Sequence, residues 1–106
     1  MSQYNAPRSQ AIYVIVRKDL PRSAQAVQGG HALAQFLLEH RTDWSNGTLV
    51  YLGVRDELTL SELKAAITNT PCSEFREPDL NDQLTAIAVL GSGELTNSDF
   101  PDLRLL

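Results

Sequence analysis

Ala11-Ile12-Tyr13-Val14-Ile15-Val16 is the stretch of sequence that decides the fold. Its β-branched and aromatic residues favour a strand, and the lack of alternation with polar residues predicts burial on both faces. The charges and the proline of Arg17-Lys18-Asp19-Leu20-Pro21 then end the strand. The stretch therefore predicts a central strand in an α/β sheet that is covered by helices.

A long helix is predicted next, from an N-cap at Ser23 to about His40. Residues at steps of three and four predict its buried face, which consists of Val27, Gly30, Ala34, Leu37 and Leu38. Gln28 is predicted to lie away from that face. Each glycine of the pair Gly29-Gly30 costs roughly 1 kcal/mol relative to alanine in a helix. Close packing of the backbone against the sheet is the predicted reason for the pair.

The rest of the pattern predicts three more strands and one more helix. The strands are expected at residues 48–54, 73–76 and 84–90, and Gly91-Ser92-Gly93 is expected to break the last one. The helix is expected to open on a capping box, with Thr59 as the N-cap and Glu62 reaching back. The fold class is therefore α/β, a mixed four-stranded sheet flanked by helices in β-α-β-α-β-β order. We expect a three-layer sandwich with a parallel first crossover.

Composition limits the class of protein. The chain has 106 residues, which is room for one domain, and 42% hydrophobic against 21% charged residues is a globular profile. Residues 1–10 are polar, lack a signal-peptide core, and are predicted to form a flexible leader to a single domain at residues 11–106. The apolar runs are far shorter than the ~20 residues of a membrane helix, so a cytoplasmic protein with no membrane partner is predicted.

The end of the chain is apolar and is predicted to dock back on the domain, through Phe100, Leu103, Leu105 and Leu106. Either this tail or an exposed edge strand could support a homodimer. Cys72 is the only cysteine, so no internal disulfide is predicted. Two distant histidines and one cysteine make neither a metal site nor a cysteine nucleophile, and no cofactor is predicted.

Charge is unevenly distributed along the chain. Residues 1–53 hold five basic and three acidic side chains, whereas residues 54–106 hold four basic and ten acidic ones. The carboxyl end of a central strand and the start of the next helix form a common ligand site in α/β folds, and the free N–H groups there attract anions. Lys18 and Arg22 flank that corner beside Asp19. The corner is thus either an anion site, or a turn that Asp19 caps between solvated cations.

Residues 12–32 resemble the opening of the type 2 peptidyl-tRNA hydrolases, which have an apolar strand, then R-x-D-L, a loop and A-A-Q-x-x-H-A. The matching residues are Arg17, Asp19, Leu20, Ala26, Gln28, His31 and Ala32. Less specific similarity continues to the end of the chain. Ala24 stands where the family has a lysine, and Ser23 where it has a glycine. The family's D-x-G-R-T-Q corresponds to Asp79-Leu80-Asn81-Asp82-Gln83, which lacks the Arg-Thr pair.

The resemblance implies hydrolysis of the ester between a peptide and the terminal ribose of tRNA, without a metal, a cofactor or a covalent intermediate. It assigns Asp19 or Asp79 to orienting the water and Gln28 to the ester or amide oxygen. The residues expected to bind the tRNA substrate are Arg17, Lys18, Arg22, His31 and Gln83.

Three alternatives accompany this interpretation. His31 falls in the apolar row of the first helix, which favours a buried histidine over a catalytic one. The missing lysine and Arg-Thr pair favour a degenerate tRNA- or protein-binding module on the same fold. The acidic C-terminal half is also compatible with a hydrolase or transferase for another anionic small molecule.

Overall fold

The computed structural model describes residues 10–92 and 104–105. Its elements are β1 (Gln10–Arg17), α1 (Arg22–Glu39), β2 (Thr48–Val54), α2 (Glu57–Ala66), β3 (Cys72–Glu77), the 3₁₀ helix η1 (Pro78–Leu80), β4 (Gln83–Ser92) and β5 (Arg104–Leu105). The predicted leader lies outside the described residues except for Gln10, which begins β1. Of the predicted apolar tail, Phe100, Leu103 and Leu106 lie outside them as well.

The strands form one sheet in the order β3-β4-β1-β2-β5. β1 and β2 run parallel, with Ala11 opposite Thr48 and Arg17 opposite Val54. The pairs β1–β4, β3–β4 and β2–β5 are antiparallel. The mixed four-stranded sheet and the β-α-β-α-β-β order are confirmed, and the two-residue strand β5 extends the sheet beyond β2.

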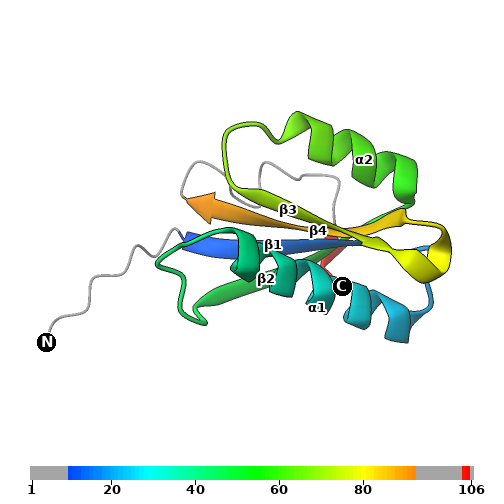
Figure 1. The fold of residues 1–106 in the computed structure, drawn as a ribbon, viewed down its shortest axis with the longest axis horizontal. Coiled ribbons are helices and arrows are strands. Elements are labelled where there is room, and N and C mark those ends of the chain that lie inside the picture. Colours follow the sequence, from blue (N-terminus) through cyan, green and yellow to red (C-terminus); the bar gives the residue numbers. More distant parts are fainter. Residues whose placement is uncertain (1–9, 93–103, 106) are drawn as a thin grey trace, which may run out of the picture.

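The two helices cover opposite faces of the sheet, which gives three layers (Figure 1). Ile12, Val14 and Val16 of β1 pack with Ala32 and Phe36 of α1. The alternate residues of β1 belong to a second core with α2, which contains Tyr13, Ile15 and Leu60. Successive side chains of a strand point to opposite faces. Both sets are therefore buried, and the absence of alternation in the sequence is explained.

The predicted buried face of α1 is wrong. The buried residues of this helix are Gln28, Gly29, Ala32 and Phe36. The predicted stripe lies on the opposite side and is exposed, including Val27 and Leu38. Gln28 is buried because the sheet supplies hydrogen-bond partners for its amide. The hydrophobicity of the sequence alone does not reveal that these hydrogen bonds compensate for burying a polar side chain.

The glycine pair in α1 has two different environments. A Cβ on Gly29 would lie 2.6 Å from Cε2 of Tyr51, so the close packing predicted from the sequence is confirmed at this position. A Cβ on Gly30 would meet no atom of the described residues within 4 Å. The predicted packing reason is therefore wrong for Gly30, because no neighbour within residues 10–92 or 104–105 would exclude a side chain there.

Gly30→Ala is expected to stabilise the fold by about 0.5–1 kcal/mol, because alanine is the better helix former and the space is open. Gly29→Ala gains the same propensity but forces the Tyr51 ring to move, which costs about 1–3 kcal/mol. Gly30→Ala should therefore be the more stable variant in urea unfolding at micromolar protein concentration. Equal stabilities of the two variants would contradict this assignment.

Three predicted helix and strand ends are wrong. α1 starts at Arg22 after Pro21, with no side-chain cap, so Ser23 is not its N-cap. α2 starts at Glu57, and the Asp56 carboxylate accepts the cap hydrogen bond from the Thr59 N–H. The local sequence offers two residues with capping side chains three positions apart, and the earlier one forms the cap. Gly91 does not break β4, because it continues the ladder opposite Ala11.

Candidate functional site

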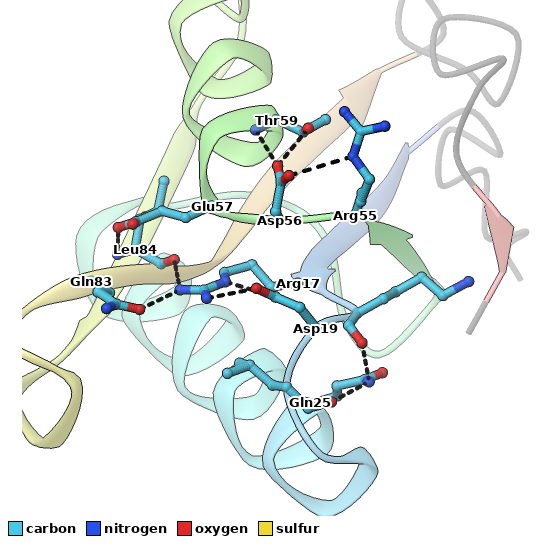
Figure 2. A network of polar contacts seen from close by, with 11 residues as sticks. Arg17, Asp19, Gln25, Arg55, Asp56, Glu57, Thr59, Gln83 and Leu84 are labelled. Carbon is cyan, nitrogen blue, oxygen red and sulfur yellow. Dashed lines mark hydrogen bonds and ion pairs between the residues drawn. The ribbon is translucent and has the colours of Figure 1, made fainter.

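The corner after β1 holds a network of polar contacts built around Arg17 (Figure 2). Two guanidinium nitrogens donate to the two carboxylate oxygens of Asp19, at 2.9 Å each. The third nitrogen donates to Oε1 of Gln83 at 2.8 Å and to the carbonyl of Leu84 at 3.3 Å. Arg17 thus ties the end of β1 to the start of β4 and to the loop before α1. It brings together three of the residues that the sequence singles out.

The strand geometry explains why Arg17 turns inward. It occupies the last position of β1, on the same face as the buried Tyr13 and Ile15, and its side chain is buried. Lys18, one residue later, has an exposed side chain while its N–H donates to the carbonyl of Val54 at 2.7 Å. A buried guanidinium needs its hydrogen bonds satisfied, and the partners above do this.

The loop between β1 and α1 is held by a residue that the sequence reasoning did not single out. The Gln25 amide donates to the Leu20 carbonyl at 2.8 Å and to the Lys18 carbonyl at 3.3 Å (Figure 2). Gln25 therefore fixes the path of the chain past Asp19. A glutamine in the first turn of a helix is too common a feature to signal this role in advance.

Electrostatics keep Asp19 ionised. The hydrogen bonds and the charge of Arg17 lower the pKa of the Asp19 carboxyl below its usual range, against a smaller opposing effect of burial. The same hydrogen bonds raise the pKa of Arg17. The Asp19 side chain is 40% exposed. The corner therefore offers solvent a fixed carboxylate whose remaining lone pairs can accept hydrogen bonds from a water or a hydroxyl.

A second network lies between α1 and the β3–β4 hairpin. Thr85, fully buried on β4, donates to Oε1 of Gln28 at 2.6 Å, and Nε2 of Gln28 donates to Glu77 at 2.7 Å. The Gln28 hydrogen bond lowers the pKa of the Glu77 carboxyl. Both polar ends of Gln28 are thus engaged inside the fold, which gives this residue a structural role.

Thr85→Val is expected to lower the free energy of unfolding by about 1–3 kcal/mol, because it leaves the buried Oε1 of Gln28 without its donor at nearly unchanged volume. Urea denaturation measures this loss. Thr68→Val is the matched control, since the exposed Thr68 hydroxyl bonds, among the residues that the structure describes, only to exposed Asn69. A Thr85→Val variant as stable as the control would show that the Gln28 contact contributes nothing.

The remaining predicted site residues lie at the surface. His31 is exposed and stacks on Phe75, with ring centroids 4.5 Å apart, so the prediction of a buried histidine is wrong. Asp79 is exposed in η1, and its N–H donates to Glu77. Lys18 and Arg22 are exposed, and their side chains make no hydrogen bond or ion pair with any residue that the structure describes.

Sequence reasoning also missed Thr85, Glu77 and Glu57 as parts of these networks. Glu57, at the first position of α2, accepts a hydrogen bond from the Leu84 N–H at 2.8 Å. It thereby anchors the same end of β4 that Arg17 contacts through the Leu84 carbonyl. An acidic residue is common in the first turn of a helix because its charge interacts favourably with the helix dipole. Its presence there does not indicate a hydrogen-bond partner 27 positions away.

The described residues offer little for other chemistries. Within residues 10–92 and 104–105 there is no cluster of three or more histidine, cysteine or acidic side chains that could hold a metal ion. Burial raises the pKa of the Cys72 thiol to about 11, which keeps it protonated near neutral pH. None of the helices among these residues is long and apolar enough to span a membrane.

No protein-family model and no curated protein matches the sequence.

Proposed function

We propose that this protein hydrolyses the ester between a peptide and the terminal ribose of tRNA. Water attacks the ester carbonyl, the bond to the ribose oxygen breaks, and the products are a carboxylic acid and a tRNA with a free hydroxyl. The observation that carries the proposal is the Asp19 carboxylate, held at both oxygens by the buried Arg17 and open to solvent. A fixed, ionised carboxylate can orient a water molecule for attack.

The surroundings of Asp19 support a phosphate-bearing substrate. Lys18 and Arg22 stand exposed on either side of it in the chain. The first turn of α1 contains no acidic residue, and Pro21 gives it no side-chain cap, so its first N–H groups retain hydrogen-bonding capacity. In this proposal the two cations contact the tRNA backbone, and the N–H groups receive the developing oxyanion or a phosphate oxygen.

Arg17 and Gln83 are positioning residues in this proposal, which differs from the substrate contacts implied by the resemblance. The Arg17 guanidinium donates its hydrogen bonds to Asp19, Gln83 and the Leu84 carbonyl. Asp79 is the weaker candidate for orienting the water, because its carboxylate makes no hydrogen bond within the described part of the chain. Asp19 is therefore assigned that role.

The test is release of N-acetyl-amino acid from N-acetyl-aminoacyl-tRNA by the purified protein. We expect turnover well above buffer at low salt and a KM that rises steeply with salt, because phosphate contacts release counterions. Lys18→Ala and Arg22→Ala should raise KM and flatten this salt dependence. Hydrolysis no faster than in buffer at high protein concentration would refute the proposal.

A non-catalytic tRNA-binding module is the second candidate. Two observations favour it: both polar ends of Gln28 are engaged inside the fold, and Ala24 stands where the resembled family has a lysine. This candidate predicts salt-dependent binding of tRNA without release of the acyl group. Ala24→Lys separates the two candidates, because a rate gain in that variant indicates a scaffold that otherwise supports catalysis.

A further inference from the structure

The outer face of α1 is apolar although it is exposed. Between Arg22 and Glu39 the helix carries no charged residue. Val27 is 55% exposed, Leu37 48% and Leu38 82%. With the small exposed residues Ala26, Gly30 and Ala34, they form a continuous stripe that we call the outer stripe. A helix face in contact with water is usually polar, so this composition favours a covering partner.

Gly30 supplies a second, independent observation. A helix-interior glycine costs roughly 1 kcal/mol relative to alanine. In the part of the chain that the structure describes, no neighbour would exclude a Cβ at this position, in contrast to Gly29. Gly30 lies between Ala26 and Ala34 at steps of four, so three small residues stand in one row. A missing side chain in the middle of an exposed apolar row permits the backbone of another helix to approach closely.

The order of sizes along the outer stripe points to an antiparallel partner with the same sequence. The stripe has small residues in its first half and two leucines in its second half. When two copies run antiparallel about a point level with Ala32, Ala26 comes level with Leu38, Val27 with Leu37 and Gly30 with Ala34 of the other copy. Each large side chain then meets a smaller one. A parallel pair would place leucine against leucine and alanine against alanine, which leaves a gap at one end.

Charge also favours the antiparallel arrangement. Lys18 and Arg22 are exposed near the start of α1, while Glu39, Arg41 and Asp43 are exposed at or shortly after its end, where acidic side chains outnumber the basic one. Antiparallel copies bring the basic start of one helix to the end that carries Asp43 and the negative end of the helix dipole. Parallel copies would place the four cations together.

We propose that the outer stripe is a two-fold interface between two copies of this chain, with antiparallel α1 helices crossing at Gly30 and Ala34. The 18 residues of α1 give a contact about 27 Å long and about 10 Å wide. The area that such a contact buries on each copy is smaller than the ~800 Å² per partner of a standard interface. Association should therefore be weak, with a Kd on the order of tens of micromolar or above.

Cross-linking tests the geometry, using the full chain with Cys72→Ser as background. A mixture of Ala26→Cys and Leu38→Cys chains should oxidise to covalent dimers in far higher yield than either variant alone. In the antiparallel pair, two copies of the same position are about 18 Å apart along the helix axis. High yields from the single variants and a low yield from the mixture would overturn the antiparallel arrangement.

Sedimentation velocity tests the interface itself. The wild-type sedimentation coefficient should rise with protein concentration, and Leu38→Glu should abolish that rise without lowering the Tm of the dilute protein. Leu58→Glu is the matched control: Leu58 is 67% exposed on α2, so this variant should associate like the wild type. A wild type that stays monomeric at millimolar concentration would overturn the proposal. So would a Tm loss in dilute Leu38→Glu, because it would mean that the chain covers its own stripe.

Discussion

Asp19→Asn should lower the rate of N-acetyl-aminoacyl-tRNA hydrolysis roughly 100- to 1000-fold. The amide removes the negative charge that orients the water, and its NH₂ group faces the guanidinium of Arg17, which carries only donors. The side chain must therefore leave the position that it holds in the wild type. The loss should fall on kcat, with KM little changed, because the tRNA contacts proposed for Lys18 and Arg22 remain.

Asp43→Asn is the matched control for this experiment. It removes the same charge from an exposed carboxylate near the other end of α1, outside the Arg17 network. We expect its kcat to equal that of the wild type. If Asp19→Asn retains full activity while the wild type hydrolyses the ester, Asp19 does not orient the water. Asp79→Asn is then the variant to measure next.

Arg17→Met should produce a large loss of stability, about 2–4 kcal/mol in urea unfolding at pH 7. The methionine fills part of the volume but leaves the Leu84 carbonyl, Gln83 and the Asp19 carboxylate without their donor. Because Asp19 is partly exposed, water replaces some of the lost hydrogen bonds, and the loss stays below that of a fully buried ion pair. Arg55→Met is the control. Arg55 is 84% exposed in its ion pair with Asp56, so the loss of stability in Arg55→Met should fall within measurement error.

The loss caused by Arg17→Met should depend on pH in a defined direction. Arg17 lowers the pKa of the Asp19 carboxyl in the folded state. The pair therefore stabilises the fold fully above the unfolded pKa of about 3.9, and this stabilisation disappears as pH falls through the folded pKa. The difference between wild type and Arg17→Met should narrow when urea unfolding is repeated near pH 3. A difference that widens in acid would mean that the ion pair does not stabilise the fold.

The strands were predictable because their signal is local. The apolar run at residues 11–16 is buried on both faces, so its composition alone identifies a central strand. β2 has the bounds expected from the sequence, and β3 and β4 extend the predicted segments by one or two residues at each end. The position of Asp19 after a central strand was likewise predictable, because the charges and the proline end the strand there.

The environment of the candidate site was not predictable from local patterns. Arg17 bonds to Gln83, 66 positions away, and Gln28 bonds to Thr85, 57 positions away. A polar residue is predicted to be exposed unless its hydrogen-bond partner is known. The sequence therefore predicts that Gln28 lies away from the buried face. Asp56, just before α2, and Thr59, in its first turn, show the same ambiguity at short range, since both side chains can cap a helix.

By itself, the sequence determined the order of strands and helices, the central position of β1 and the acidic group at its end. Only the tertiary structure decided which side of α1 faces the sheet. The helix has apolar residues on both sides, so the hydrophobic effect alone does not choose between them. The choice depends on Thr85 and Glu77, which satisfy the buried Gln28 amide, and on Tyr51, which requires Gly29 beneath its ring.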